Sequence, residues 1–448
     1  MSCPVFLQFW WTGRARDTFL SFLPKEDLTS LRLACHDFSV RAAPMLFEDV
    51  SVTFRPSIFT KPARMAALDR IGHHVRNFEF RMPHGPETFL PPLLDPSTGE
   101  EVTFIYEPYV QPSGDSTSRL SVPTYGSWEM TDMLVKQYPP LFHAAANVPS
   151  FTRALSSVPN LKHLMVSCPG QEKDQRYRRS IVDYALISLR IAVERSKLPA
   201  LDSLTLSPIH AGAVLYLNPT MGFGASPQSM RRWRQIRRLT VEMDSVPFTP
   251  FPPADHLKTL NAYLQVFAPS VKQLTFRWRG SKGLCPLTLH EEICLQGQNP
   301  MLACPRRSHI ALRPLKFRKL REMEVENVIM DASQISSFIS SHRRRLIEFN
   351  FEDTKLRSGN WDQALKPLTR ISGSEKWKEK SEEVMDVPLV LGPVGIEQTT
   401  MDRMVKEFPF PQQRTPQPGR GWHRAGAKLL GTPDHMRRLL KSSVFTWI

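Results

Sequence analysis

Four residues between positions 285 and 309 have side chains that could bind a metal ion. They are Cys285, Cys294, Cys304 and His309, and thiolate and imidazole groups are the usual ligands of zinc. Zinc sites usually bring their ligands in close pairs about two to four residues apart, whereas these cysteines are nine and ten residues apart. The spacing favours ordinary loop cysteines, and we predict no metal site.

A lone Gly-x-Gly, formed by Gly222 and Gly224, is the sequence's only suggestion of a phosphate-binding loop. Such a loop needs a third glycine and a strand directly before it, and both are missing here. No P-loop, HExxH or nucleophile-elbow motif is present either. We therefore predict no catalytic residues and no cofactor.

Arginine side chains that could bind an anion come in two runs. The first arginine run is Arg231, Arg232 and Arg234, and the second is Arg343, Arg344 and Arg345. Each lies where a helix is expected to end and a strand to begin, so stacked repeats would bring both runs together on one rim. Arginine there could bind carboxylate or phosphate groups through paired hydrogen bonds. The plainer explanation is that cations near helix C-termini complement the helix dipole and need no ligand.

Both runs lie beside members of a repeated pattern of six residues. An apolar residue is followed by two mostly polar residues, an apolar residue, any residue and an apolar residue, as in the LxxLxL core of a leucine-rich repeat. The last three residues alternate between two faces, as a strand does. The pattern occurs eight times, at 47–52, 75–80, 161–166, 201–206, 236–241, 271–276, 320–325 and 346–351.

These hexads predict strands that pair in parallel and in chain order. Their central apolar residues should then stack as one buried ladder that includes Leu204, Leu239, Leu274, Met323 and Phe349. The polar positions between them, such as Ser203, Thr205, Thr240 and Glu324, should form a surface with few exposed aromatic side chains.

Amphipathic stretches lie between the hexads and predict helices. They run from Val182 to Val193, from Leu257 to Phe267 and from Ile335 to Ile339, with a shorter one from Phe151 to Leu155. Asp331 is the expected cap of the third. Alternating strands and helices predict an α/β fold with helical crossovers. The units are 35 to 40 residues apart, longer than about 20–29 in regular leucine-rich repeats, so we expect an irregular solenoid with inserted loops.

Residues 19–46 precede the first strand and have a different pattern. Leu28, Leu31, Cys35 and Phe38 recur at helical spacing on one face, Asp27 is a good N-cap, and Pro44 should end the helix. So small a helical unit cannot bury its own apolar face. It must pack on the next domain, on a partner, or on both.

The stretch LSFLPKEDLTSLRLACHDF, residues 20–38, resembles the second half of an F-box. The Leu-Pro pair that usually opens an F-box is absent near Thr12-Gly13. Residues 70–108 and 359–379 resemble segments of fungal F-box proteins with repeat-like C-terminal domains. The residues that carry the F-box resemblance are Leu20, Phe22, Leu23, Asp27, Leu28, Leu31, Arg32, Leu33, Cys35 and Phe38.

In that family the F-box docks on a Skp-family adaptor, which bridges to a cullin, and the downstream domain holds a protein substrate. The resemblance therefore implies a non-catalytic substrate-recognition subunit of a Skp–cullin–F-box ubiquitin ligase. The arginine runs would bind an acidic or phosphorylated segment of the substrate, whose identity the sequence does not reveal. The adaptor would contact Leu20, Phe22, Leu23, Leu28, Leu31, Leu33, Cys35 and Phe38.

Two other hypotheses remain. The missing Leu-Pro pair is consistent with a scaffold of the same fold that binds no adaptor. The net charge of +15 is consistent with a nucleic-acid-associated protein in which Trp233 stacks on a base, but no RRM, KH or helix-turn-helix signature supports it. The sequence contains no apolar run of about 18 residues, so we predict no membrane span. Six scattered cysteines suit a reducing compartment, the cytoplasm or the nucleus.

The predicted domain organisation has four parts. An atypical N-terminal segment (1–18) is followed by the F-box-like helical module (19–46). An irregular leucine-rich-repeat-like α/β domain (47–392) carries a long proline-rich insertion at 82–126 and a loop at 280–313. The basic tail (393–448) is rich in proline, glycine, glutamine and arginine, and we expect it to be poorly ordered.

Overall fold

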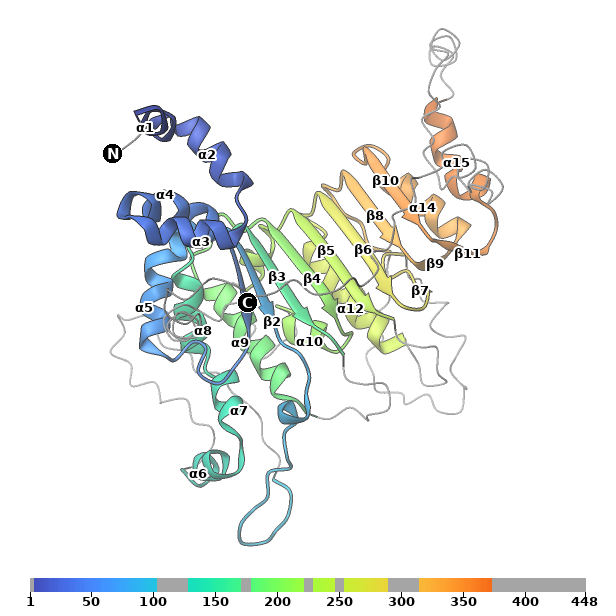
Figure 1. Ribbon diagram of the computed structural model, residues 1–448. Helices are drawn as coiled ribbons and strands as arrows, with labels where there is room; N and C mark the ends of the chain where they lie inside the picture. The colour runs from blue at the N-terminus through green and yellow to red at the C-terminus, as the bar shows by residue number, and fades with distance from the viewer. Residues whose placement is uncertain are drawn as a thin grey trace, which may run out of the picture. The chain divides into compact units, whose positions relative to one another are not determined.

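The computed structural model describes residues 4–102, 128–170, 179–220, 229–245, 254–288 and 314–372. These residues form an α/β fold around a parallel sheet of eight strands, which cross the sheet in the order of the chain (Figure 1). The predicted tail at 393–448 lies outside the described residues.

Every predicted hexad contains a strand of this sheet, and the predicted parallel pairing is confirmed. In β-strands successive side chains point to opposite faces, so the apolar positions of each hexad lie together on one face. The strands are β1 (Asp49–Thr53), β2 (Asn77–Arg81), β3 (His163–Cys168), β4 (Ser203–Ile209), β5 (Arg238–Asp244), β6 (Gln273–Arg279), β8 (Glu322–Glu326) and β10 (Glu348–Glu352).

The central apolar residues of the hexads form the predicted ladder. Leu204, Leu239, Leu274 and Met323 occupy matching positions on neighbouring strands and are at most 3% exposed. Phe349 continues the ladder on β10 but is only half-buried, contrary to the prediction. The reason is its position, because β10 is the last strand of the sheet and has a neighbour on one side only.

Helices connect the strands and cover the apolar face of the sheet (Figure 1). All four predicted amphipathic stretches are helical, in α8, α9, α12 and α14. Around and between the strands the structure places α5 (Pro62–Ile71), η1 (Gly72–His74), η2 (Pro86–Thr88), α6 (Trp128–Gln137), α7 (Pro140–Ala145), α8 (Val148–Ser156), α9 (Ile181–Arg195), α10 (Ala213–Leu217), α11 (Ser229–Trp233), α12 (Ala254–Phe267), α14 (Ala332–His342) and α15 (Trp361–Ser372).

Local signals explain where these helices begin. The Ser180 hydroxyl accepts a hydrogen bond from the Val182 N–H and so caps α9. Asp331 is the N-cap of α14, as predicted, and its own N–H donates to the Gln334 side chain. Gly72 allows η1 to approach α8 closely, because a Cβ there would lie 1.9 Å from the Ser157 carbonyl oxygen.

The predicted loop at 280–313 is wrong over its first part. Gly283–Leu284 forms β7, which joins β9 (Val328–Asp331) and β11 (Lys355–Ser358) in a second parallel sheet of three strands. Cys285 and Leu287 are buried in the same core. Pairing with β9 therefore makes this segment a strand, although its composition predicted a loop. Residues 289–313 lie outside the described residues.

The proline-rich insertion is irregular up to residue 102, as predicted, and is anchored at two places. The Leu90 N–H donates to the Arg179 carbonyl oxygen at 3.0 Å, and Leu93 is buried. The Val102 N–H donates to the Leu93 carbonyl oxygen at 2.7 Å. Residues 103–127 lie outside the described residues.

Four N-terminal helices precede the sheet: α1 (Pro4–Trp11), α2 (Gly13–Phe22), α3 (Lys25–Ala34) and α4 (His36–Leu46). Three predictions are corrected here. Pro24 rather than Asp27 is the N-cap of α3, which leaves Asp27 in the first turn, where its charge favours the helix dipole. Pro44 lies inside the last turn of α4 and does not end it. Cys35 is extended and separates α3 from α4, so it is not on a helix face.

Among the described residues, no helix combines the length and the apolar composition that crossing a bilayer would require.

Candidate functional site

The N-terminal helices enclose a small apolar core of their own. Trp10, Leu20, Leu28 and Ala42 are buried in it. The Trp10 ring meets the Phe38 ring edge to face at 4.5 Å. The Trp10 indole N–H donates to the Asp37 carboxylate at 2.6 Å, and this hydrogen bond lowers the pKa of Asp37. The sequence analysis expected the apolar faces of these helices to pack on the next domain or on another protein. Part of this apolar surface instead packs within the module.

This core divides the predicted adaptor-binding residues into three groups. Leu20 and Leu28 are fully buried, so the assumption that they lack an internal partner is wrong. Leu23, Leu31 and Phe38 pack on the core and are partly exposed. The third group is exposed: Phe22 at 82%, Leu33 at 71%, and Cys35. The helical spacing of Cys35 had suggested that it belongs to the core, but Cys35 is exposed.

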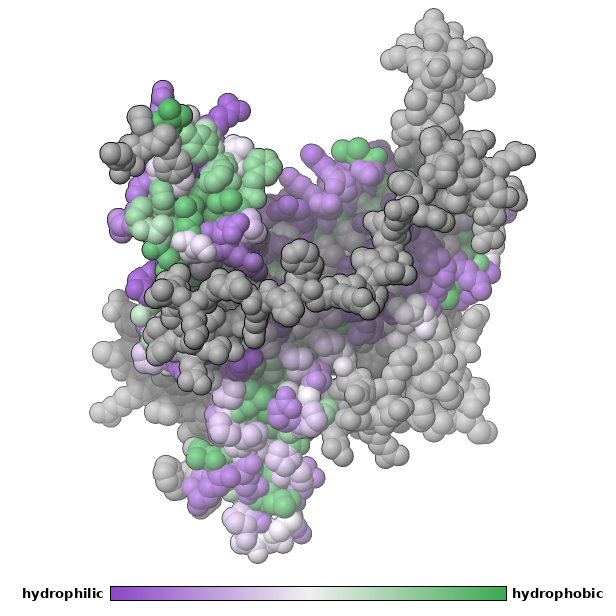
Figure 2. Space-filling view, viewed as in Figure 1, coloured by the Kyte–Doolittle hydropathy of each residue, from purple (hydrophilic) through white to green (hydrophobic). Residues whose placement is uncertain are grey.

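Exposed hydrophobic side chains gather on these helices. Figure 2 shows hydrophobic surface concentrated over them, in the upper left of the view. Of the ten large hydrophobic side chains that are exposed in the described residues, six lie between positions 5 and 40. Trp11, Phe19 and Val40 are among the six, and sequence reasoning missed all three because they lie outside the F-box pattern. The six are Val5, Trp11, Phe19, Phe22, Leu33 and Val40.

The first arginine run has a structural role at Arg232. Its guanidinium donates to the carbonyl oxygens of Ser196 and Leu198 at 2.7 and 3.2 Å, just beyond the C-terminal end of α9. Burial lowers the pKa of Arg232, and the Arg231 charge lowers it further. Arg231 and Arg234 are exposed. Arg232 thus matches the plainer explanation, a cation that stabilises a helix end.

Trp233, between these arginines, is buried rather than available to a base. Its ring packs edge to face on Phe267, with centroids 6.2 Å apart, and its indole N–H donates to the Glu194 carboxylate at 3.0 Å. The suggestion that Trp233 stacks on a nucleic-acid base is therefore wrong.

The second arginine run follows α14 and is exposed, and Arg345 donates to the Arg318 carbonyl oxygen. The strands that follow the two runs, β5 and β10, are three strand spacings apart, which is about 14 Å. No contact in the described residues joins the two runs. They lie at corresponding points of their units, but the structure does not bring them together.

A different set of basic residues is aligned in a row, which Asp202 interrupts between Lys162 and Arg237. The second position of the hexad precedes each strand, and its backbone carbonyl accepts two successive N–H groups from the next unit. The Arg76 carbonyl, for example, accepts from Lys162 and His163 at 2.8 and 3.0 Å. The same bonding repeats at seven consecutive units and aligns these positions along the amino-terminal edge of the sheet. Five of them are basic, and we call them the basic row: Arg76, Lys162, Arg237, Lys272 and Arg321.

A shallow groove of about 350 Å³ adjoins the basic row, on the polar face of the sheet. Its floor includes His163 and Thr205, whose side chains are hydrogen-bonded at 2.9 Å. Burial lowers the pKa of His163 and the nearby Arg238 charge lowers it further, so this imidazole is neutral at pH 7. Arg76, Lys162 and Arg238 line the groove together with Glu48, and Arg76 and Arg238 pair with Glu48 and Asp202, so Lys162 is the cation of the lining that makes no ion pair with a described residue.

The opposite end of the polar face is acidic. Glu324, Glu326 and Glu352 of β8 and β10 have carboxylate oxygens within 4.8 Å of one another. Arg277 of β6 pairs with Glu326 and, at 3.8 Å, with Glu242. A ligand lying across the sheet would therefore meet positive charge near β2 to β6 and negative charge near β8 and β10.

The residues of the rejected metal and phosphate motifs give little chemistry. Cys285 is buried, and burial raises the pKa of its thiol to about 11, so it is neither nucleophilic nor ionised at pH 7. Cys294, Cys304, His309, Gly222 and Gly224 lie outside the described residues.

Comparison with known proteins adds no family to this description. No protein-family model matches the chain, and no curated protein matches its sequence.

Proposed function

We propose that this chain is a non-catalytic substrate-recognition subunit of a Skp–cullin–F-box ubiquitin ligase. Its N-terminal helices bind a Skp-family adaptor, and its sheet domain binds an acidic or phosphorylated segment of a protein substrate. The observation that carries the proposal is the concentration of exposed hydrophobic side chains on the four N-terminal helices, which contain the stretch that resembles an F-box.

Energetics favour a partner at this surface. Phe22 and Leu33 project from a module whose core is already filled, so leaving them in water gains nothing for the fold. Burying each against a partner would contribute about 1.5–3 kcal/mol. Contiguous exposed hydrophobic surface of this kind usually marks an interaction site. The residues best placed to contact the adaptor are therefore Phe22, Leu33, Cys35 and Val40, with Leu23, Leu31 and Phe38 at their base.

The sheet domain supports the second half of the proposal. Parallel strands in chain order, each preceded by the same bonded turn, are what an irregular leucine-rich-repeat-like solenoid would contain. Such domains present an open strand face to protein ligands. Lys162, Lys272 and Arg321 make no ion pair with any residue that the structure describes, so their charges are available to carboxylate or phosphate groups.

The acidic end of the polar face weighs against the nucleic-acid hypothesis. A polyanion that followed the sheet beyond the basic row would meet Glu322, Glu324 and Glu348, which line a second hollow of about 190 Å³. Like charges at close range oppose binding. A protein segment, unlike a nucleic acid, can carry both signs of charge and match both ends.

The adaptor half of the proposal predicts the effect of charge on the exposed hydrophobic surface. Phe22→Asp with Leu33→Asp should weaken binding to a purified Skp-family adaptor by about 100-fold or more, because carboxylates facing an apolar partner cost several kcal/mol. The measurement is a pull-down followed by calorimetric titration. Ile347→Asp is the matched control, since Ile347 is equally exposed but precedes β10, and it should bind as the wild type does.

The folded state of each variant is checked by far-ultraviolet circular dichroism. If the folded wild-type chain does not bind the adaptor, the proposal fails in favour of the scaffold without an adaptor.

The substrate half of the proposal predicts which basic residues bind anions. Lys162→Glu with Lys272→Glu should weaken binding of an acidic phosphoserine peptide by about 10-fold, because both charges lie on one edge. Changing Arg343, Arg344 and Arg345 to Ala should have a smaller effect, since that run lies beyond the basic row. Fluorescence anisotropy at several salt concentrations measures the peptide affinity of both variants and of the wild type.

The same titration with duplex and single-stranded oligonucleotides separates protein recognition from nucleic-acid recognition. A nucleic-acid binder would show a steep decline of affinity with salt. Sub-micromolar affinity for an oligonucleotide at physiological salt, lost in the charge variants, would replace the receptor proposal with the nucleic-acid one.

A further inference from the structure

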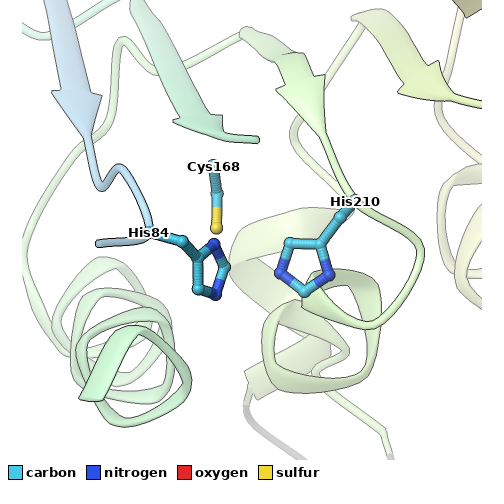
Figure 3. Close-up of side chains that lie close together, drawn as sticks. All are labelled: His84, Cys168 and His210. Carbon is cyan, nitrogen blue, oxygen red and sulfur yellow. The ribbon is translucent and has the colours of Figure 1, made fainter. Parts of the chain in front are cut away.

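Three side chains that commonly bind metals meet at the carboxyl ends of adjacent strands. Cys168 is the last residue of β3, His210 directly follows β4, and His84 lies three residues after β2. One ring nitrogen of each histidine and the Cys168 sulfur all lie within 4.8 Å of one another. Figure 3 shows the His84 ring directly below the Cys168 sulfur and the His210 ring beside them. None of the surfaces described above includes this cluster.

The sheet itself brings these residues together. β2, β3 and β4 are parallel neighbours, so the segments that leave them emerge side by side. The His210 N–H donates to the Cys168 carbonyl oxygen at 3.0 Å, which continues the pairing one residue beyond β4. The two imidazole rings lie edge to face with centroids 5.1 Å apart. The geometry is therefore held by main-chain bonding and not by flexible loops alone.

The protonation of His84 suits a metal ligand. Its Nδ1 lies 2.7 Å from the Pro169 carbonyl oxygen, which can only accept, so Nδ1 carries the proton. The lone pair is then on Nε2, a buried atom with no hydrogen-bond partner in the described residues. Metal-binding histidines usually donate their other N–H to a carbonyl or carboxylate in this way.

The electrostatic environment of Cys168 also favours a cation. The thiol is fully buried, and the negative charge of Asp183 lies close enough to act on it. The negative field of Asp183, in the first turn of α9, would be offset by a metal ion at the cluster.

We propose that His84, Cys168 and His210 form a binding site for a thiophilic divalent cation of the zinc class. Tetrahedral coordination with the usual Zn–N and Zn–S bond lengths places ligand atoms roughly 3.3–3.6 Å apart, so ligand atoms that lie within 4.8 Å of one another need to approach by at most about 1.5 Å. On binding, the Cys168 thiol releases its proton to solvent and the sulfur forms the metal bond. Three protein ligands leave the fourth position for water.

The site would tie together the ends of three strands and so stabilise this part of the sheet. It makes no use of the adaptor-binding helices or the basic row. The proposal therefore stands independently of the function proposed above.

The test is metal binding by the full chain. After chelation and dialysis, the wild-type protein should bind about one equivalent of Zn²⁺ in competition with a chromophoric chelator, and its melting temperature should rise by several degrees, roughly 5 °C. Co²⁺ in place of Zn²⁺ should produce tetrahedral visible bands and a thiolate-to-cobalt charge-transfer band. The charge-transfer band reports a sulfur ligand directly.

Cys168→Ser should abolish the charge-transfer band and weaken Zn²⁺ binding by at least about 100-fold. Even the loss of a side chain that hydrogen-bonds to a metal ligand usually lowers metal affinity by about 10- to 100-fold. Cys285→Ser is the matched control, another buried cysteine, and should leave both signals unchanged. If circular dichroism shows that Cys168→Ser is unfolded, His210→Asn, at a half-buried position, takes its place with the Zn²⁺ affinity as readout. Absence of a saturable site in the wild type overturns the proposal. A thiolate band that survives in Cys168→Ser but is lost in Cys285→Ser also overturns it.

Discussion

Replacing Glu194 by Gln is expected to destabilise the folded chain by about 3–5 kcal/mol. Arg190 of α9 is fully buried and donates to the Glu194 carboxylate, which is itself 6% exposed, at 3.2 Å. Burial lowers the pKa of Arg190, and the Glu194 charge opposes this shift. Glutamine keeps the shape and an acceptor for the Trp233 indole N–H but removes the charge. The loss therefore reports the buried arginine left without its counter-ion.

Chemical denaturation of the full chain, followed by tryptophan fluorescence and far-ultraviolet circular dichroism, measures this loss. The double variant Arg190→Met with Glu194→Leu should recover most of the stability, because replacing a whole buried ion pair by apolar residues is often nearly neutral. A double variant as unstable as Glu194→Gln would show that lost packing, and not the uncompensated charge, causes the effect.

Leu274→Ala is expected to cost about 2–5 kcal/mol, close to the largest effect of any truncation in the ladder. Leu274 is fully buried on β6, with Leu239 and Met323 beside it on the neighbouring strands. The strand pairing on both sides prevents the backbone from collapsing into the space that the leucine leaves. The lost transfer free energy of the removed methyl groups and the free-energy cost of the remaining cavity therefore add.

Phe349→Ala provides the comparison for Leu274→Ala. Phe349 occupies the same position in its hexad but lies half-exposed on the last strand, so its truncation should cost less even though phenylalanine is larger. Thermal and denaturant unfolding measure both variants. Equal losses would mean that the position in the hexad, and not the position in the sheet, determines how much free energy of unfolding is lost on truncation.

The hexads also explain why sequence reasoning pointed to the two arginine runs and overlooked the basic row. Consecutive arginines such as Arg343, Arg344 and Arg345 are conspicuous in a sequence, whereas Arg76, Lys162 and Lys272 are single residues many positions apart. The signal was present, because all three occupy the second position of a hexad. Only the repeated main-chain bonding shows that this position lies on one edge.

The sequence by itself determined the strands of the eight-stranded sheet, their parallel order and the crossover helices, but not the second sheet of three strands. These features depend on local patterns, an apolar alternation of period two in the hexads and of period 3.6 between them, and each pattern is complete within a few residues. The cap of α14 at Asp331 is predictable for the same reason, since its N–H bonds to Gln334 in its own first turn, although its carboxylate also pairs with Arg357 of β11. The α/β class follows from the alternation of the two patterns.

Only the tertiary structure decided which apolar residues of the N-terminal helices face solvent. Leu20 and Phe22 are two residues apart and equally hydrophobic, but α4 and Trp10 cover the first and leave the second exposed. Likewise, His84, Cys168 and His210 are far apart in the chain and meet because three strands end side by side. Exposure and convergence depend on which elements pack together, and packing is a property of pairs of elements that no single stretch of sequence contains.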